Sequence, residues 1–207
     1  MGAESPDTPM LACWSCRGPA SVREMFCRTC GAVQPPGQID HFSRLGLDAA
    51  FAIDPALIER RYFEQQRQLH PDRFATRSPR ERALSQSQAT AINEAYETLK
   101  DPLRRAGYLL QTRHAADGSA GVTHANDPDL LLEAMELREA LEDAGTPEAV
   151  RALAQSARVD IERCVANVAD AFARSDFDEA ARLTTRLTYL HKLTDDCRAR
   201  LQRRAGR

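Results

Sequence analysis

Residues 60–74 read RRYFEQQRQLHPDRF, an amphipathic segment that runs into the tripeptide His70-Pro71-Asp72. A histidine two positions from a carboxylate raises the question of acid–base catalysis. Proline, however, favours an extended backbone before it, so the His70 and Asp72 side chains should diverge and bond each other poorly. The sequence also offers no glycine-rich phosphate loop or serine triad to complete a catalytic constellation. Taken alone, the tripeptide predicts a surface turn that ends a helix, and we assign no catalytic residues.

The segments on both sides of this turn predict helices. Apolar residues recur at helical spacing over about residues 55–69 and 79–99. A helical turn is expected in HFSRLGL, at residues 41–47, and a further helix from Pro102. Five helix starts combine a capping side chain with a proline at the first helical position, where its missing N–H costs nothing: Asp54-Pro55, Ser78-Pro79, Asp101-Pro102, Asp127-Pro128 and Thr146-Pro147.

The C-terminal half predicts a three-helix bundle. Residues 113–127, RHAADGSAGVTHAND, are polar, rich in small residues and without periodicity, so they should form a loop. Helices are then expected over about 128–144, 147–174 and 177–203, and the middle one carries an apolar seam typical of a bundle. Apolar and polar residues do not alternate over a stretch long enough to predict a sheet, so any strands should belong to the N-terminal segment. The predicted fold class is mainly α.

The N-terminal segment holds two C-x-x-C pairs, formed by Cys13, Cys16, Cys27 and Cys30. Two such turns can aim four sulfurs at one ion in a tetrahedral site. About thirty residues cannot bury a useful core, so a metal would supply the folding energy. We predict structural Zn²⁺, with iron in a rubredoxin-like site or a redox dithiol as alternatives. The two lone cysteines, Cys164 and Cys197, lie in helical patterns and should be small buried hydrophobic residues.

Composition excludes some partners and locations. The formal charge of −2 gives no global field that would attract nucleic acid or a membrane surface. The N-terminus, MGAESPDTPM, resembles neither a secretory signal nor an arginine-rich transit peptide, and no apolar run approaches the roughly 18 residues that would span a bilayer. We therefore expect neither nucleic acid nor a membrane as partner. A cytoplasmic location is expected, ahead of the mitochondrial matrix.

The order of features around the tripeptide resembles the J domain, whose members are co-chaperones of DnaK-class ATPases and not enzymes. The resemblance rests on DHFSRLGL at residues 40–47, on residues 60–74, and on INEAYETLKDPLRRAGYLL at residues 92–110. It implies that the His-Pro-Asp loop docks on a DnaK- or HscA-type chaperone and triggers ATP hydrolysis there. Seven arginines against three carboxylates over residues 60–82 agree with docking on an acidic partner. The chaperone-binding residues so implied are His70, Pro71, Asp72, Arg60, Arg61, Arg67 and Arg73.

The C-terminal half narrows the resemblance to the HscB type of J protein, which serves iron–sulfur cluster biogenesis. The segments that carry it are DPDLLLEAMELREALEDAG, at residues 127–145, and DFDEAARLTTRLTYLHKLTDDCRARL, at residues 176–201. The resemblance implies that this bundle holds an IscU-type scaffold protein through Leu131, Leu132, Met135, Glu136, Glu139 and Tyr189. Residues 132, 135, 136 and 139 also share one helix face, and Leu130, Leu131 and Leu132 cannot all face a core.

Three domains are predicted: a tetracysteine module with its linker at residues 1–38, a J domain at 39–113, and the loop and bundle at 114–207. The stretch QPPGQ, at residues 34–38, marks the first boundary. Two alternatives remain open at this stage. The chain could be a J protein with a different client, or a thiol oxidoreductase that uses the N-terminal cysteines.

Overall fold

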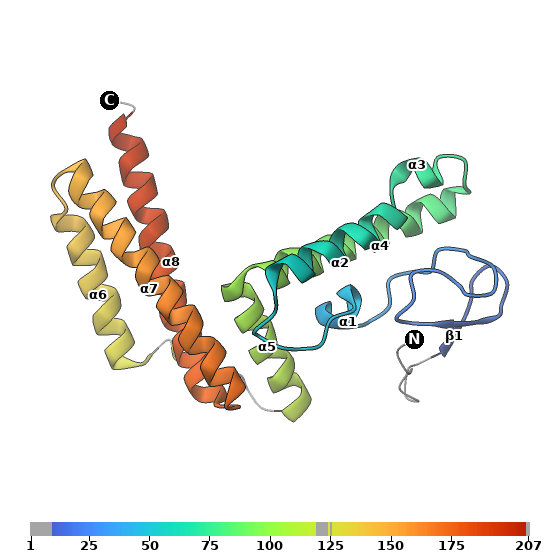
Figure 1. The fold of residues 1–207 in the computed structure, drawn as a ribbon, viewed down its shortest axis with the longest axis horizontal. Helices are drawn as coiled ribbons and strands as arrows, with labels where there is room; N and C mark the ends of the chain where they lie inside the picture. The colour runs from blue at the N-terminus through green and yellow to red at the C-terminus, as the bar shows by residue number, and fades with distance from the viewer. Residues whose placement is uncertain (1–9, 119–123, 125, 206–207) are drawn as a thin grey trace. The chain divides into compact units, whose positions relative to one another are not determined.

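The computed structural model describes residues 10–118, 124 and 126–205. These residues form two compact units. Unit 1 comprises the described residues up to Ala49 together with Ile53–Asp101, and unit 2 comprises Ala50–Ala52 and the described residues from Pro102 onward. Each unit has its own core, and each is described by itself below (Figure 1).

Unit 1 begins with a two-stranded antiparallel sheet of β1 (Met10–Ala12) and β2 (Pro19–Ser21). Its helices are α1 (His41–Leu45), α2 (Pro55–Gln68), α3 (Pro71–Phe74) and α4 (Pro79–Lys100). The long helices α2 and α4 run side by side, and α1 and α3 also pack on α4 (Figure 1). The helical core is formed by fully buried side chains from three of these helices, among them Phe42, Leu45, Ile58, Ile92 and Leu99.

Unit 2 consists of α5 (Pro102–Asp117), α6 (Pro128–Asp143), α7 (Pro147–Ala173) and α8 (Phe177–Ala205). The helices α7 and α8 pack along each other, α6 packs against both, and α5 packs mainly on α8. Leu187 and Val168 are fully buried between them. Phe51 belongs to this unit because its ring stacks on Phe172, with the ring centroids 5.3 Å apart.

The predicted fold class is confirmed, since the described chain is mainly helical with a small cysteine module whose strands are the only ones described. Four predicted proline-marked starts carry a side-chain cap in the structure, at Asp54, Ser78, Asp127 and Thr146. Cys164 and Cys197 are fully buried, as predicted. No helix within the described ranges is both long enough and apolar enough to cross a membrane.

Two local predictions were wrong. The loop expected over residues 113–127 starts later, because α5 continues to Asp117 and is followed by Gly118 at a φ of 65°. Residues 119–123 and 125 of that loop lie outside the described residues. At the His-Pro-Asp tripeptide, His70 has the extended backbone expected before a proline, with φ of −53° and ψ of 133°, but the surface turn predicted there is the start of the short helix α3. The three predicted domains stay a prediction, since the division into compact units reports packing and not independent folding.

Candidate functional site

His70, Pro71 and Asp72 form the N-terminus of the short helix α3. His70 is the N-cap residue, and its Nδ1 atom accepts a hydrogen bond from the Asp72 backbone N–H at 3.3 Å. Pro71 occupies the first helical position. This cap turns the imidazole back over the helix start, so His70 Nδ1 lies 3.5 Å from Asp72 Oδ2 and the predicted divergence of the two side chains is wrong. Both side chains are well exposed, at 60% and 90%, and such a pair can contact another protein.

Buried residues on each side hold this turn in place. Leu69 and Phe74 are both buried, and Phe74 is the last residue of α3. On the neighbouring helix α4, the Ser85 hydroxyl donates a hydrogen bond to the Leu69 carbonyl at 3.0 Å. The tripeptide is therefore displayed from a fixed base, with its polar side chains outward and its flanking apolar side chains inward.

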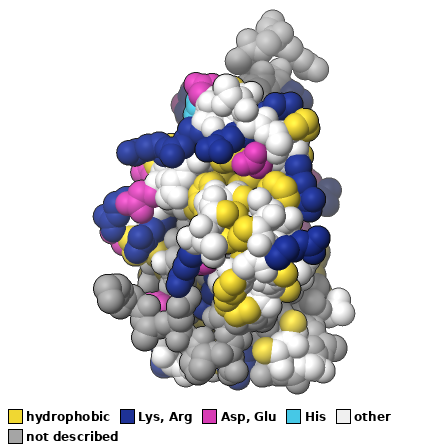
Figure 2. Space-filling view, turned by 90° about the vertical axis from the view of Figure 1, so that its right-hand side faces the viewer, with side chains coloured by type: hydrophobic (Ala, Val, Ile, Leu, Met, Phe, Trp, Pro, Cys, Tyr) yellow, Lys and Arg dark blue, Asp and Glu magenta, His cyan; other side chains and the backbone are white. Residues whose placement is uncertain are grey.

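Exposed arginines lie on the two helices that meet at the turn. Arg60, Arg61 and Arg67 lie on α2 and Arg73 on α3, and all four side chains are exposed. Arg61 is 3.5 Å from Glu64, an ion pair that contributes little at such exposure. Figure 2 views the molecule from the side on which α3 and the cysteine module lie in Figure 1, and it shows Lys and Arg side chains around exposed apolar ones. This surface offers positive charge to an acidic partner.

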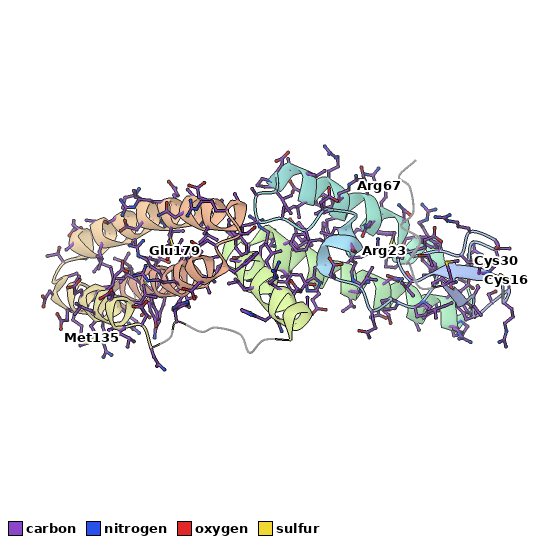
Figure 3. All side chains as sticks on the ribbon, turned by 90° about the horizontal axis from the view of Figure 1, so that it is seen from below. Cys16, Arg23, Cys30, Arg67, Met135 and Glu179 are labelled. Atoms are coloured by element: carbon purple, nitrogen blue, oxygen red, sulfur yellow. The ribbon has the colours of Figure 1, made fainter. Side chains whose placement is uncertain are left out.

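The three consecutive leucines at the start of α6 divide as predicted. Leu130 is buried, at 1% exposure, whereas Leu131 and Leu132 are 43% and 57% exposed. Met135, one turn further along, is 60% exposed and lies on the outer side of α6 (Figure 3). Large apolar side chains exposed together in this way are unusual away from an interaction surface. Glu136 and Glu139 are also exposed on this helix.

A groove of about 740 Å³ runs between α6 and α8. Of the predicted scaffold-binding residues, Leu131 and Met135 line it from α6, and the half-buried Tyr189 lines it from α8. Leu132, Glu136 and Glu139 are not among its lining residues, so the structure brings together three of the six. Sequence reasoning missed the charged part of its lining, which consists of Arg138, Glu142, Lys192, Asp196, Arg200 and Arg203.

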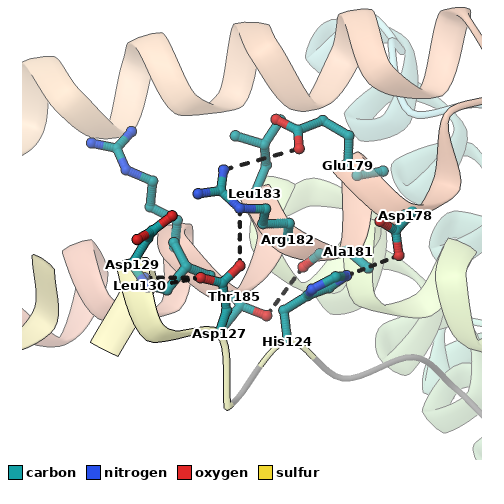
Figure 4. A network of polar contacts seen from close by, with 12 residues as sticks. His124, Asp127, Asp129, Leu130, Asp178, Glu179, Ala181, Arg182, Leu183 and Thr185 are labelled. Atoms are coloured by element: carbon teal, nitrogen blue, oxygen red, sulfur yellow. Dashed lines mark hydrogen bonds and ion pairs between the residues drawn. The ribbon is translucent and has the colours of Figure 1, made fainter. Parts of the chain in front are cut away.

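Polar contacts fix the N-terminus of α6 against α8 (Figure 4). Asp127 caps α6 by accepting from the backbone N–H groups of Asp129 and Leu130, and its second oxygen accepts from Arg182 Nε at 3.1 Å. The pKa of Asp127 is lowered because the Leu130 N–H and the Arg182 guanidinium both favour the carboxylate. His124 Nε2 lies 3.1 Å from Asp178 Oδ1 at the start of α8.

A second pair of contacts fixes the rest of α6. Arg186 forms a bidentate pair with Glu133, with N–O distances of 2.6–2.8 Å, and both side chains are mostly buried. Near the other end of the helix, Arg200 donates to the Leu141 carbonyl. Together with the Asp127–Arg182 pair, these contacts hold one side of α6 on α8 and leave Leu131 and Met135 on the wall of the open groove.

The four N-terminal cysteines come together at two equivalent turns. In the first turn, the Cys13 carbonyl accepts from the Arg17 N–H and the Cys13 N–H donates to the Gly18 carbonyl. In the second, Cys27 makes the same two bonds with Gly31 and Ala32. Arg17 and Gly31 occupy corresponding positions, and both have left-handed backbones, with φ of 64° and 72°. The short repeat CWSCRG and CRTCGA thus folds twice in the same way.

The two turns bring the four sulfurs within 4.8 Å of one another. The Cys13–Cys30 and Cys16–Cys27 Sγ atoms are each 3.8 Å apart. Cys13 and Cys27 are buried, whereas Cys16 and Cys30 lie at the exposed edge of the module (Figure 3). A group of four thiolates with these separations can hold one metal ion.

Backbone N–H groups set the acidity of these thiols. The pKa of Cys13 is lowered to about 6, chiefly because the backbone N–H groups of Cys16 and Ser15 donate to its sulfur. The Cys30 backbone N–H lowers the pKa of Cys27 in the same way. The Gly18 N–H also favours the Cys16 thiolate, but the neighbouring sulfurs and partial burial outweigh it and raise the pKa of Cys16 to about 11.

Two family descriptions match successive parts of the chain. The DnaJ domain matches residues 40–108, and the HSCB C-terminal oligomerisation domain matches residues 126–198. The human iron–sulfur cluster co-chaperone protein HscB is 34% identical over 187 residues, which cover 88% of this chain and 79% of the human protein. The chain belongs to the HscB family of co-chaperones. The predicted family is thus confirmed.

Further comparisons with HscB proteins agree. The crystal structure of human co-chaperone protein HscB superposes with a TM-score of 0.82 at 32% identity, covering 92% of this chain and 98% of the human chain. The co-chaperone protein HscB homolog of Bordetella parapertussis is 35% identical over 164 residues, which cover 77% of this chain and 95% of the bacterial protein. Within this HscB-family chain, the His-Pro-Asp turn falls in the DnaJ match, and most residues that line the α6–α8 groove fall in the HSCB match. The four cysteines lie outside both.

Proposed function

We propose that this HscB-family chain is an adaptor between two proteins in iron–sulfur cluster assembly. Unit 2 binds an IscU-type scaffold protein through the α6–α8 groove and the adjoining face of α6. Unit 1 presents His70, Pro71 and Asp72 to a DnaK- or HscA-type ATPase and stimulates its ATP hydrolysis, which favours cluster transfer from the scaffold. Neither nucleic acid nor a membrane takes part, and a cytoplasmic location stays a prediction.

One observation carries this proposal: the same chain displays two separate interaction surfaces of different chemistry. The His-Pro-Asp turn is exposed, polar and flanked by arginines, which suits a charged and selective contact. The groove lined by Leu131, Met135 and Tyr189 is apolar with charges at its margin, which suits a stable docking contact. A chain that catalyses no reaction itself can then act by bringing its two partners together.

The two surfaces can be tested by variants that should fail in opposite ways. His70→Gln removes the imidazole while leaving the groove untouched, so we expect loss of ATPase stimulation with unchanged scaffold affinity. Leu131→Ala with Met135→Ala should weaken scaffold binding while the scaffold-independent stimulation remains. Both quantities are measured with purified proteins, by single-turnover ATP hydrolysis and by calorimetry. Stimulation retained by His70→Gln would rule out the assignment of the turn.

The flanking arginines need a matched control. Arg73→Ala removes an exposed charge next to the turn, whereas Arg158→Ala removes an exposed charge from α7 in unit 2. We expect the first variant to weaken the chaperone interaction most at low salt, because screening reduces contributions from exposed charges. The second variant should behave as the parent chain. Equal effects of the two variants would show that only net charge matters.

The cysteine module, in this proposal, holds a structural Zn²⁺ ion. Four sulfurs at tetrahedral positions around zinc, with Zn–S bonds of about 2.3 Å, would be separated by about 3.8 Å. The Cys13–Cys30 and Cys16–Cys27 separations of 3.8 Å support this reading. Elemental analysis of the purified chain should find about one zinc per chain. Iron at that stoichiometry, with the absorption of a ferric tetrathiolate, would instead favour the rubredoxin-like alternative.

The arrangement of the thiols gives the oxidoreductase alternative no support. A redox C-x-x-C pair needs an accessible thiol whose pKa is lowered, because the thiolate is the nucleophile. Here the two thiols with a lowered pKa, Cys13 and Cys27, are both buried. Rapid disulfide exchange by the metal-loaded chain would contradict this reading.

A further inference from the structure

The cysteine module is attached to helix α4 at two points. Gln88 Nε2 on α4 donates a hydrogen bond to the Gln34 backbone carbonyl at 3.0 Å, and both residues are buried, with exposures of 3% and 6%. The Arg80 guanidinium lies over the Trp14 ring, 4.4 Å from its centroid. Positions 80 and 88 are about two helical turns apart, so both contacts come from one face of α4.

Gln34 connects this attachment to the sulfur cluster. Its side-chain Nε2 atom donates to Cys13 Sγ at 3.3 Å and to the Ala32 carbonyl at 2.8 Å. Cys13 is one of the four candidate metal ligands and is fully buried. Gln34 therefore contacts the cluster with its side chain, and its backbone carbonyl accepts the hydrogen bond from Gln88 of α4. Hydrogen bonds from outside the ligand set orient ligands and tune their affinity for metal.

The same part of α4 holds the His-Pro-Asp turn. Ser85, which lies between Arg80 and Gln88, donates to the Leu69 carbonyl directly before His70. A cleft of about 280 Å³ also lies between the module, which contributes Phe26 and Gly31, and the turn region, which contributes Gln68, Arg73, Phe74, Arg77 and Glu81. Helix α4 thus contacts the cysteine module and the turn within three helical turns of its own length.

We propose that the metal state of the cysteine module controls the rigidity of the His-Pro-Asp turn through Gln34, Gln88 and α4. Without metal, a module of this size lacks the core to stay folded, and its backbone withdraws from α4. The buried Gln88 amide then loses its hydrogen-bond partner, and the first half of α4 unfolds locally more often. Each such opening also breaks the hydrogen bond from Ser85 to the Leu69 carbonyl. Metal loss therefore lowers ATPase stimulation and leaves scaffold binding unchanged. This consequence for the chaperone rests on the function proposed above.

Amide hydrogen exchange of the full chain tests the coupling without any chaperone. In the structure, the Arg73 and Arg77 backbone N–H groups donate to the carbonyls of His70 and Phe74. After metal removal with a chelator, we expect their exchange, and that of residues 80–90, to become faster by on the order of tenfold. Exchange in α7 and α8 should stay the same. Loss of protection confined to the cysteine module would overturn the proposal.

Two variants separate the coupling from general destabilisation. Gln88→Met keeps the side-chain length but removes the amide donor, whereas Gln86→Met makes the same change at an exposed position on the same helix. Coupling is reciprocal, so Gln88→Met should lower zinc affinity by about the same factor by which zinc protects the turn. Gln86→Met should leave affinity unchanged. Zinc competition with a chromophoric chelator measures both, and equal affinities for the two variants would refute the link through Gln88.

Outcomes for this link and for the proposed function are distinguishable. If the metal-loaded parent chain fails to stimulate the ATPase, the proposed function is wrong, while exchange and zinc affinity still decide the coupling. If the parent stimulates and the metal-free chain stimulates equally well, the coupling has no effect on the chaperone and the proposal fails.

Discussion

Met135 and Leu131 give the proposed scaffold-binding groove a quantitative test. Burying a leucine or methionine side chain completely contributes about 1.5–3 kcal/mol, and a partner can bury only the part that is still exposed. Met135 is 60% exposed and Leu131 43% exposed. Scaling by these fractions gives about 1–2 kcal/mol for Met135 and about 0.6–1.3 kcal/mol for Leu131. Met135→Ala should then weaken scaffold binding by about 5- to 30-fold, and Leu131→Ala by about 3- to 9-fold.

The assay is isothermal titration calorimetry of the scaffold protein with each full-length variant. Met135 is mostly solvated in the free chain, so its truncation should change thermal stability little. Leu131 is more than half buried, so its variant is compared with the parent at a temperature well below both unfolding midpoints. Val159→Ala is the matched control, because Val159 is an apolar residue on α7 that is 52% exposed and does not line the groove. A folded Met135→Ala chain that binds the scaffold with parental affinity would refute the reasoning. A weaker Val159→Ala chain would show that exposed apolar area in general contributes.

Three further predictions concern stability. Arg186→Met leaves Glu133 partly buried without its partner, so the free energy of unfolding should fall by about 1–3 kcal/mol in urea titrations. Because the pKa of Asp127 is lowered in the folded chain, its carboxylate contributes fully to the free energy of unfolding above about pH 4, and this contribution is lost as the pH falls through the lowered pKa. In Asp127→Asn, the free energy of unfolding should therefore fall less steeply on acidification than in the parent chain. Gly31→Ala meets no atom within 4 Å but keeps a φ of 72°, so it should destabilise the metal-loaded module by about 1 kcal/mol, measured by zinc competition.

Local rules predicted most helix starts, and one start escaped them for a physical reason. Asp54, Ser78, Asp127 and Thr146 have the oxygen acceptors that usually cap helices, and each precedes a proline. His70 also precedes a proline and caps α3, but through the ring Nδ1 atom. Histidine is not among the preferred caps, so the sequence predicted a surface turn there and no helix start. The Nδ1 atom of His70 is bonded to Cγ, as the Oδ1 atom of Asp54 is, so each can accept from the backbone N–H two residues further on.

The end of α5 had a signal that sequence reasoning passed over. Gly118 follows the last helical residue and takes a left-handed backbone, which is the usual way for a helix to end. The polar composition of residues 113–127 suggested a loop instead. Composition averages over the whole stretch, whereas the glycine marks one position, and the glycine was the better guide.

The groove itself could be predicted only on one side. Three consecutive leucines cannot share a face, so an exposed apolar surface on α6 followed from the sequence. Which residues of α8 lie opposite depends on pairs such as Arg186 with Glu133, which are 53 positions apart. Nothing local in the sequence fixes such a pairing. The charged lining from Lys192 to Arg203 was missed for this reason.

Because the two surfaces belong to different units with separate cores, their cooperation needs no conformational signal between them. Linkage in one chain can suffice, since tethered groups reach effective concentrations of order millimolar when the geometry allows both to engage. A mixture of His70→Gln chains and Leu131→Ala/Met135→Ala chains at micromolar concentration contains both intact surfaces, but never on one molecule. We expect this mixture to leave scaffold-enhanced ATP hydrolysis close to the level of either variant alone. Recovery of parental hydrolysis would mean that surfaces on different chains cooperate, as they would in an oligomer, and that linkage within one chain is not what the adaptor requires.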